Sequence, residues 1–303
     1  DTFSLCNREK VEDSYYYGGE PIWVTAEKQG VKSASFYWVG SEAAHQGIYP
    51  SIWKSFDSSV PFENRLDSVI SWLKLPADSR PHLITWYFEE PDKVGHDYGP
   101  VSPETKKTVE YLDSLVGVFV KKIKTLPYAD KINLIFISDH GMGEISKKRY
   151  INVLDVVDTS LLDYYIGYNP VVFLQPRTGL TDSVDNRLDE IKHISSWTRD
   201  EIPQKLAYGS SDRISDIIVV ADSGWSVGLS GNNLKETGGA HGYDNFNKDM
   251  GAIFYAFGPA FKTNYIHPET QNTEIYNLLT YILDIKPSEN EGDIQRVKGL
   301  LKE

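Results

Sequence analysis

Three segments of this sequence combine histidine with glycine, and two of them also contain an adjacent carboxylate. They are Glu89–Pro100, Ser138–Gly143 and Gly238–Asn245. Carboxylate oxygens and imidazole nitrogens are the ligands that zinc-type cations take in proteins. The residue types therefore indicate a divalent metal site, provided that the fold brings the three segments together.

The first segment follows a predicted buried strand, His82–Phe88. Pro91 ends the hydrogen-bonded ladder of that strand, and the glycines at positions 95 and 99 allow the backbone to fold tightly. We therefore expect Asp92 and His96 to converge on a single point. A carboxylate oxygen and an imidazole nitrogen at this spacing suit a zinc-type cation.

The second segment follows another predicted strand, Ile132–Ser138. Adjacent side chains on a regular strand point to opposite faces, so Asp139 and His140 can share one ion only where the strand has already broken. Gly141 permits that break. The third segment is predicted to be a glycine-dense loop in which flexible backbone flanks His241.

A single aspartate or histidine at the end of a strand is more often a cap or a solvated surface group than a ligand. We assign this structural role to the other four histidines, His45, His82, His193 and His267. Three glycine-rich histidine segments together are harder to explain by packing, because glycine costs backbone entropy and contributes no core volume. They predict a close approach of the backbone to another group.

Strands and helices alternate along the chain, which predicts an α/β fold with a mainly parallel sheet and helices on both faces. Apolar runs predict strands at His82–Phe88, Ile132–Ser138, Ala252–Phe257, Ser33–Trp38, Val171–Leu174 and Asp216–Val220. Helical periodicity marks Phe62–Leu73, Val109–Ile123 behind a Ser102 cap, and Ile275–Leu283. We expect one domain over residues 1–303, with a small peripheral insert around residues 143–216.

The composition limits the classes of partner. The chain has 303 residues and a formal charge of -12, which repels a polyanionic duplex but allows a small phosphate ester held by metal ions. Duplex nucleic acid is therefore not an expected partner. No run of about 18 apolar residues occurs, so no transmembrane segment is expected. Cys6 is the single cysteine, which excludes an intrachain disulfide and a thiolate zinc site.

Taken in chain order, the three segments resemble the metal-binding motifs of the nucleotide pyrophosphatase/phosphodiesterase family, within the alkaline phosphatase superfamily. The matching residues are Pro91-Asp92-x-x-Gly95-His96-x-x-Gly99-Pro100, Ser138-Asp139-His140-Gly141-Met142 and Gly239-Ala240-His241-Gly242-Tyr243-Asp244. Gly19–Ala26, Phe36–Glu42, Val60–Glu63 and Pro81–His82 are similar to the family as well. The resemblance covers nearly the whole chain and implies an alkaline-phosphatase-like fold.

The resemblance also implies two divalent ions, with zinc as the expected metal. Asp92, His96 and His241 would hold one ion, and Asp139 and His140 the other. The implied substrate is a small nucleotide or related phosphodiester. Residues that match substrate-contacting positions of the family are Phe56, Tyr87, Trp38, Glu42 and, with a one-residue shift, Lys10. Phe56 and Tyr87 would contact the base; core packing is the alternative role for each aromatic residue.

In the family, a threonine attacks the phosphodiester, and water then cleaves the phosphoryl-enzyme to release a nucleoside monophosphate. That threonine and the first metal-binding aspartate lie upstream of the motif that matches Gly19–Ala26. We therefore expect both in an N-terminal segment that precedes Asp1, and we expect this chain to be nearly inactive alone. Thr25 and Thr85 are predicted to be strand residues instead. The resemblance implies a periplasmic or extracellular location.

Three other functions stay open. A phosphodiesterase acting on lipid or choline-type diesters would use the same chemistry on another substrate. A catalytically inactive metal-binding module would retain the ligands without the nucleophile. A phosphomonoesterase or sulfatase is the third, although sulfatases need a cysteine or serine in a specific upstream motif, and the surroundings of Cys6 do not match it.

Overall fold

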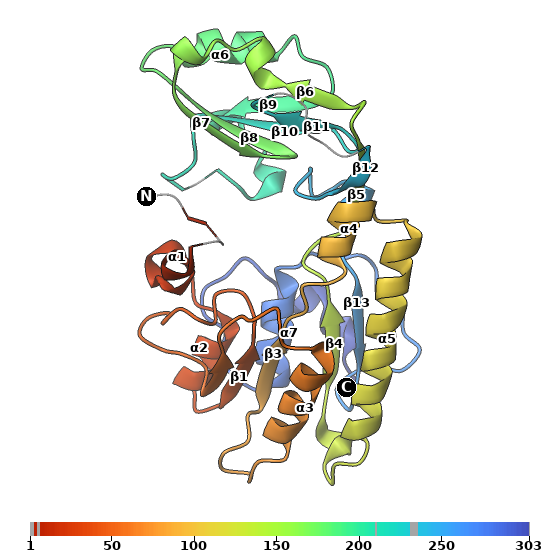
Figure 1. Ribbon diagram of the computed structural model, residues 1–303. Helices are drawn as coiled ribbons and strands as arrows, with labels where there is room; N and C mark the ends of the chain where they lie inside the picture. Colours follow the sequence, from red (N-terminus) through yellow and green to blue (C-terminus); the bar gives the residue numbers. More distant parts are fainter. Residues whose placement is uncertain (1–2, 5–6, 210, 231–235, 303) are drawn as a thin grey trace. The chain divides into compact units, whose positions relative to one another are not determined.

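The computed structural model describes residues 3–4, 7–209, 211–230 and 236–302, so Cys6 lies outside the described residues. The chain divides into two compact units (Figure 1). Unit 1 comprises residues 1–89, 111–136 and 255–303, and unit 2 comprises residues 90–110 and 137–254. The expected single domain with an insert around residues 143–216 stays a prediction. Each unit is described by itself.

Unit 1 contains a three-stranded parallel sheet in the order β2-β1-β3. Its strands are β1 (Ser33–Phe36), β2 (Ile52–Lys54) and β3 (Leu83–Trp86). Side chains of β1 alternate between the two faces, as strand geometry requires. Ala34 and Phe36 pack into one apolar cluster, whereas Ser33 on the opposite face donates hydrogen bonds to Glu27.

Helices cover both faces of this sheet, which confirms the α/β architecture expected from the sequence. One face packs against α3 (Phe62–Leu73) and the C-terminal part of α5 (Pro103–Ile123) through a shared apolar cluster. The other packs against α2 (Ile22–Lys28) and α7 (Glu274–Ile282). A second pairing joins β4 (Leu134–Ile137) to β13 (Phe254–Phe257), and the short helix α1 (Arg8–Glu12) lies near the N-terminus.

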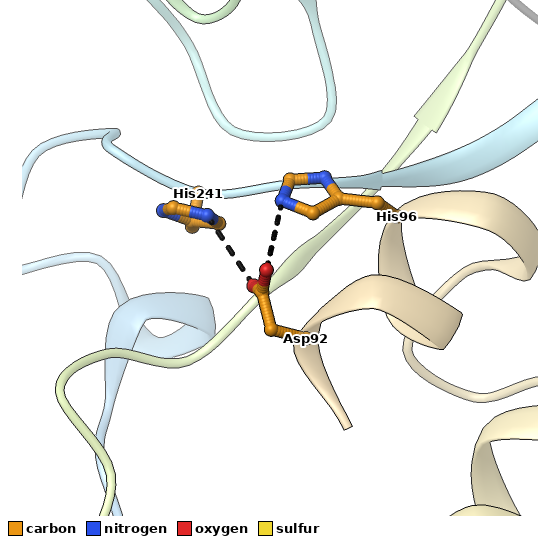
Figure 2. Close-up of side chains that lie close together, drawn as sticks. All are labelled: Asp92, His96 and His241. Carbon is orange, nitrogen blue, oxygen red and sulfur yellow. Dashed lines mark ion pairs between the residues drawn. The ribbon is translucent and has the colours of Figure 1, made fainter. Parts of the chain in front are cut away.

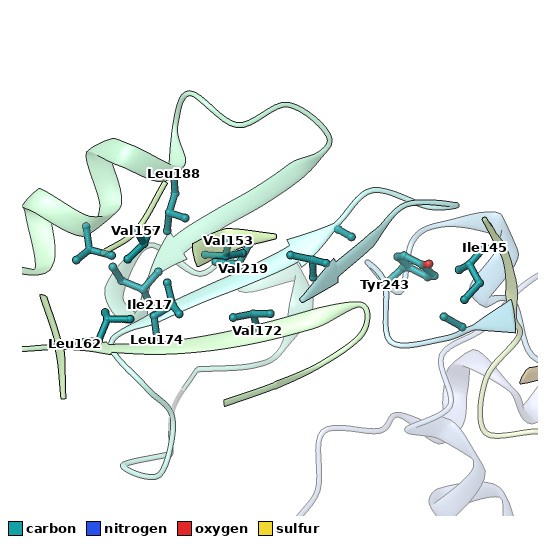
Figure 3. Close-up of a cluster of buried hydrophobic side chains, with 14 of the residues drawn as sticks. Ile145, Val153, Val157, Leu162, Val172, Leu174, Leu188, Ile217, Val219 and Tyr243 are labelled. Carbon is teal, nitrogen blue, oxygen red and sulfur yellow. The ribbon is translucent and has the colours of Figure 1, made fainter. Parts of the chain in front are cut away.

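Unit 2 is built on a four-stranded antiparallel sheet in the order β7-β8-β10-β9. Its strands are β7 (Leu162–Tyr168), β8 (Val171–Pro176), β9 (Ile194–Thr198) and β10 (Ile217–Ala221). Helix α6 (Thr181–Leu188) contributes Val184 and Leu188 to the apolar cluster of this unit (Figure 3). Strands β8 and β10 match the predicted strands Val171–Leu174 and Asp216–Val220, but their antiparallel pairing was not expected, because the sequence predicted a mainly parallel sheet.

Two short strand pairs complete unit 2. Strand β6 (Tyr150–Asn152) pairs in parallel with β11 (Ser226–Gly228), and β5 (Gly143–Ser146) pairs antiparallel with β12 (Thr237–Ala240). Helix α4 (Asp92–Tyr98) packs against β12. None of the described helices combines the length and apolar character needed to cross a membrane.

Three local predictions are wrong. Thr25 lies in helix α2 rather than in a strand, because the run Ile22–Ala26 packs a continuous apolar helix into the core. The turn expected after Pro91 is helix α4, which begins at Asp92. The third histidine segment does not begin as a loop, because its glycines form strand β12. Thr85 lies in β3, as expected.

Strand β12 needs glycine at positions 238 and 239 because the backbone of α4 lies against it there. A Cβ atom on Gly238 would lie 2.8 Å from the carbonyl oxygen of His96, and one on Gly239 would lie 2.6 Å from that of Gly95. The sulfur of Met142 occupies the space beside both Gly95 and Gly239. Helix and strand therefore approach one another more closely than any side chain would permit. The predicted close approach is one of backbone to backbone.

Leu174→Ala should lower the free energy of unfolding of unit 2 by about 2 to 5 kcal/mol, the range for a truncated buried leucine that leaves a cavity. Leu174 has 0% exposure in the centre of the cluster. Urea denaturation followed by tryptophan fluorescence measures the change. Ile166→Ala is the control, since Ile166 is 50% exposed on the neighbouring strand β7 and should have an effect below about 1 kcal/mol. Equal losses would contradict the assigned core.

Gly239→Ala should destabilise unit 2 by about 1 to 3 kcal/mol, because the added methyl overlaps Met142 and the Gly95 carbonyl. Gly117→Ala is the matched control. Gly117 lies inside α5, and none of the described atoms lies within 4 Å of its Cβ position, so alanine there should stabilise by about 0.5 to 1 kcal/mol. Thermal unfolding of both variants distinguishes the effects. A neutral Gly239→Ala would mean that α4 and β12 are not in close contact.

Candidate metal centre

Helix α4 places Asp92 and His96 on one face, because residues four apart lie one above the other on a helix. Asp92 is the first residue of the helix. The Glu90 side chain accepts a hydrogen bond from the backbone N–H of Val94, which caps one of the unpaired donors of the first turn. The convergence expected for Asp92 and His96 thus arises from helical spacing.

His241 follows the last residue of β12 and meets the same carboxylate. Figure 2 shows Asp92 between the two imidazoles: its Oδ1 lies 3.4 Å from His241 Nε2, and its Oδ2 lies 3.5 Å from His96 Nε2. Ligand atoms of the three residues all lie within 4.8 Å of one another. Three ligand atoms this close together could hold one cation.

Asp139 and His140 lie beyond the end of β4, where the regular strand has ended. The His140 ring stacks on that of His241 with centroids 3.6 Å apart, and Asp139 Oδ2 lies 3.3 Å from His140 Nε2. Gly141 allows this path because a Cβ atom there would overlap the carbonyl oxygens of Asp249 and Gly251. All five side chains singled out as ligands are therefore neighbours within unit 2.

Backbone carbonyls fix which imidazole nitrogen is available. His96 Nδ1 lies 2.8 Å from the carbonyl oxygen of Gly239, and His140 Nδ1 lies 2.9 Å from that of Gly141. A carbonyl only accepts, so each Nδ1 must carry the proton and donate. In the neutral imidazole Nε2 then carries the lone pair, and in both residues it faces a carboxylate, the arrangement typical of histidine ligands.

The charges in this cluster fit a cation. Among the described residues Asp92 Oδ1 has no hydrogen-bond partner and is buried, although the side chain as a whole is 40% exposed; a positive charge would compensate this oxygen. Burial, together with the neighbouring His140, lowers the pKa of His241, while Asp92 opposes that shift. A lowered pKa keeps the imidazole neutral, which is the form that binds metal. Asp92, His96 and His241 therefore fit a divalent ion.

Other residues of the histidine segments serve the structure. Burial raises the pKa of Tyr243 to about 12, and its hydroxyl donates to the carbonyl of Trp225. Asp244 forms an ion pair with Lys205. Of the four histidines expected to be structural, His45 is buried against the Gly40 carbonyl and His193 stacks on Trp225. None of the four belongs to the ligand cluster found among the described residues.

The aromatic residues expected at the substrate lie in unit 1. Phe56 follows β2, is 39% exposed, and packs edge-on against Tyr37 with ring centroids 5.2 Å apart. Tyr87 follows β3 and is partly buried against the cluster under α3. Trp38 is partly buried against the cluster under α2. Phe56 is thus the most exposed of the three rings.

The two charged residues expected at the substrate also lie in unit 1. Glu42 is buried and forms an ion pair with Arg8 of helix α1. Lys10 belongs to the same helix, and its ammonium lies 5.1 Å from the centroid of the Tyr16 ring. The Arg8–Glu42 pair therefore holds α1 beside the loop after β1.

Two residues that support the predicted site residues were not predicted from the sequence. Met142 fills the space between α4 and β12, and the only signal was its place in the Ser138–Met142 motif. Tyr37 supports Phe56 and has a left-handed backbone, with φ of 65°. No pattern in a single sequence marks a tyrosine for that conformation, which non-glycine residues rarely adopt.

Residues 2–244 match the model of the type I phosphodiesterase/nucleotide pyrophosphatase family. Human ectonucleotide pyrophosphatase/phosphodiesterase family member 1 is 38% identical over 99% of this chain and 34% of the relative's own length. Venom phosphodiesterase CdcPDE from Crotalus durissus collilineatus is 35% identical over 95% of this chain and 36% of its own length. The chain thus spans about a third of the length of the curated relatives it matches.

Solved structures agree with the α/β fold. Murine ectonucleotide pyrophosphatase/phosphodiesterase 5, an inactive threonine-to-alanine variant in complex with AMP, superposes with a TM-score of 0.91 at 31% identity. The match covers 97% of this chain and 78% of that one. The fold is alkaline-phosphatase-like, as expected. Together with the family match, it shows that this chain belongs to the type I phosphodiesterase/nucleotide pyrophosphatase family.

Proposed function

We propose that this chain is part of a metal-dependent hydrolase of nucleotide phosphodiester and pyrophosphate bonds that releases a nucleoside monophosphate. The observation that carries the proposal is the cluster of Asp92, His96 and His241, in which one buried carboxylate oxygen has no hydrogen-bond partner in the part of the chain that the structure describes. Family membership supplies the reaction class. The cluster supplies a place where a phosphoryl group would meet positive charge.

Asp92, His96 and His241 would hold one divalent ion, and Asp139 and His140 would contribute to a second. Mixed nitrogen and oxygen ligands favour zinc. When bound, such ions neutralise charge on the phosphoryl group and lower the pKa of a hydroxyl nucleophile or water. The backbone carbonyls of Gly239 and Gly141 orient the His96 and His140 imidazoles. The ligands would therefore be held in place before substrate arrives.

Phe56 is the residue we propose to stack on the nucleobase, because an exposed aromatic face suits every base. The murine relative that was solved in complex with AMP supports a nucleotide as substrate. Tyr87, Trp38, Glu42 and Lys10 would complete the pocket. A lipid or choline-type diester is the alternative substrate, and no contact in the described residues favours it over a nucleotide.

The hydroxyl nucleophile is proposed to be a threonine outside these 303 residues, acting through a phosphoryl-threonine intermediate. The inactive threonine-to-alanine variant of the murine relative supports this choice of residue. The near-inactivity of this chain alone stays a prediction. We also propose that the protein acts outside the cytoplasm, as the names of the ectonucleotide and venom relatives suggest; none of the relatives named here supports the periplasm.

The complete protein should hydrolyse thymidine 5′-p-nitrophenyl phosphate faster than p-nitrophenyl phosphorylcholine, and chelation should abolish both activities. The 303-residue chain should show only a small fraction of that rate, because it lacks the proposed nucleophile. Release of p-nitrophenol measures all three reactions. Preference for the choline ester would favour the alternative substrate. The complete absence of metal-dependent hydrolysis in the complete protein would favour an inactive metal-binding module.

His241→Ala should lower the bound metal by about one ion per chain, because it removes one of three ligands from the first site. Asp139→Asn should weaken the other site instead. Elemental analysis of dialysed protein measures both. His193→Ala is the control, as His193 is an exposed histidine of unit 2 paired with Asp222 outside the cluster. Unaltered metal content in His241→Ala would refute the ligand assignment.

A further inference from the structure

Arg65 is a buried cation within unit 1. Its side chain, on helix α3, is 1% exposed, and its guanidinium donates to both oxygens of Glu89 at 2.5 and 2.8 Å. Its Nε donates to the carbonyl of Val60 at 2.9 Å. Burying a charge is costly unless it is paired and hydrogen-bonded, and this bidentate geometry satisfies both needs. Arg65 is therefore fixed in one orientation.

The flat faces of the guanidinium are also occupied. Its central carbon lies 4.6 Å from the centroid of the Phe62 ring and 5.0 Å from that of Tyr37. Cation–π attraction is stronger where water is excluded, as it is around the Arg65 side chain, which is 1% exposed. Glu89 orients the Arg65 guanidinium, and the guanidinium in turn packs against the Tyr37 ring.

Tyr37 in turn supports Phe56. The two rings meet at 66° with centroids 5.2 Å apart, an edge-to-face contact that restricts how the Phe56 ring can turn. Tyr37 is 5% exposed and Phe56 is 39% exposed, so the series of contacts runs from the core to the surface. Glu89, Arg65, Tyr37 and Phe56 form a continuous series, all within unit 1.

We infer that Arg65 and Tyr37 are positioning residues for recognition of the nucleobase: the buried Arg65–Glu89 pair fixes Tyr37, which holds the Phe56 ring ready for stacking. This inference rests on the proposed function, in which Phe56 contacts the base. Stacking on a ring that is already oriented avoids the entropy of ordering it on binding. Substrates that carry a base therefore depend on this series, whereas diesters without a base do not.

The test compares two substrates of the complete protein, thymidine 5′-p-nitrophenyl phosphate and methyl p-nitrophenyl phosphate, which has no aromatic group besides the leaving group. Arg65→Lys keeps the charge but loses the bidentate fork and the flat stacking surface. We expect the ratio of KM values, nucleotide over base-free diester, to rise about tenfold, within the range that base stacking supplies, with kcat for the nucleotide little altered. Equal changes for both substrates would overturn the inference, because general misfolding affects them alike.

Arg80→Lys is the matched control. The Arg80 guanidinium lies 3.8 Å from the Tyr128 ring centroid and donates to the carbonyl of Leu75, also within unit 1. It resembles Arg65 in chemistry, but none of its described contacts reaches Phe56. The KM ratio should therefore stay at the wild-type value, and a tenfold rise there would contradict the specific role of Arg65.

A second pair of variants tests the inference independently if Arg65→Lys fails to fold. Tyr37→Leu removes the supporting ring without leaving a buried charge unpaired, and Tyr37→Phe restores the ring. Calorimetric titration with AMP should show an affinity about five- to tenfold weaker for Tyr37→Leu only, while inorganic phosphate binds all forms alike. Equal AMP affinity in both variants would overturn the inference. Normal AMP results in a protein without hydrolysis would instead refute the proposed function alone.

Discussion

The contact between helix α4 and strand β12 is the constraint on which the candidate metal centre depends. Gly238 and Gly239 lack side chains, so the strand lies against the carbonyls of Gly95 and His96, with the Met142 sulfur beside them. That approach places His241 within reach of Asp92, and it lets the Gly239 carbonyl accept from His96 Nδ1. The glycines thus supply no ligand atom themselves. They allow the close approach of α4 and β12 that sets the distance between the ligand residues.

Electrostatics completes the arrangement. Among the described residues, the cluster brings a buried carboxylate oxygen without a hydrogen-bond partner, Asp92 Oδ1, together with the Nε2 atoms of His96 and His241. A cation would compensate the buried Oδ1 of Asp92, whose side chain as a whole is 40% exposed. The formal charge of -12 on the chain increases the need for a local cation if an anionic phosphate ester is to bind. In unit 1, the bidentate pair of Arg65 and Glu89 shows the opposite case, a buried charge that the protein compensates from within.

Much of the fold could be predicted because the pattern is local. The helices at Phe62–Leu73 and Pro103–Ile123 and strands β1 and β3 of unit 1 follow from apolar periodicity, whereas β2 was not predicted. Ser102 accepts from the backbone of Thr105 as its capping position predicts. Helix α4 was missed because Pro91 and two glycines suggested a turn, although the four-residue spacing of Asp92 and His96 already fits a helix. Strand β12 was missed because glycine weakens strand propensity. Its glycines are needed because the backbone of α4, far away in sequence, lies against them. Long-range contacts of this kind leave no local pattern.

Anomalous diffraction at the zinc edge, from crystals of the complete protein grown with zinc, tests the central claim most directly. The account predicts one peak bounded by Asp92, His96 and His241, and a second beside Asp139 and His140, about 3.5 to 4 Å from the first as in other two-metal sites. Zinc peaks confined to other residues, with Asp92 facing an empty cluster, would contradict it.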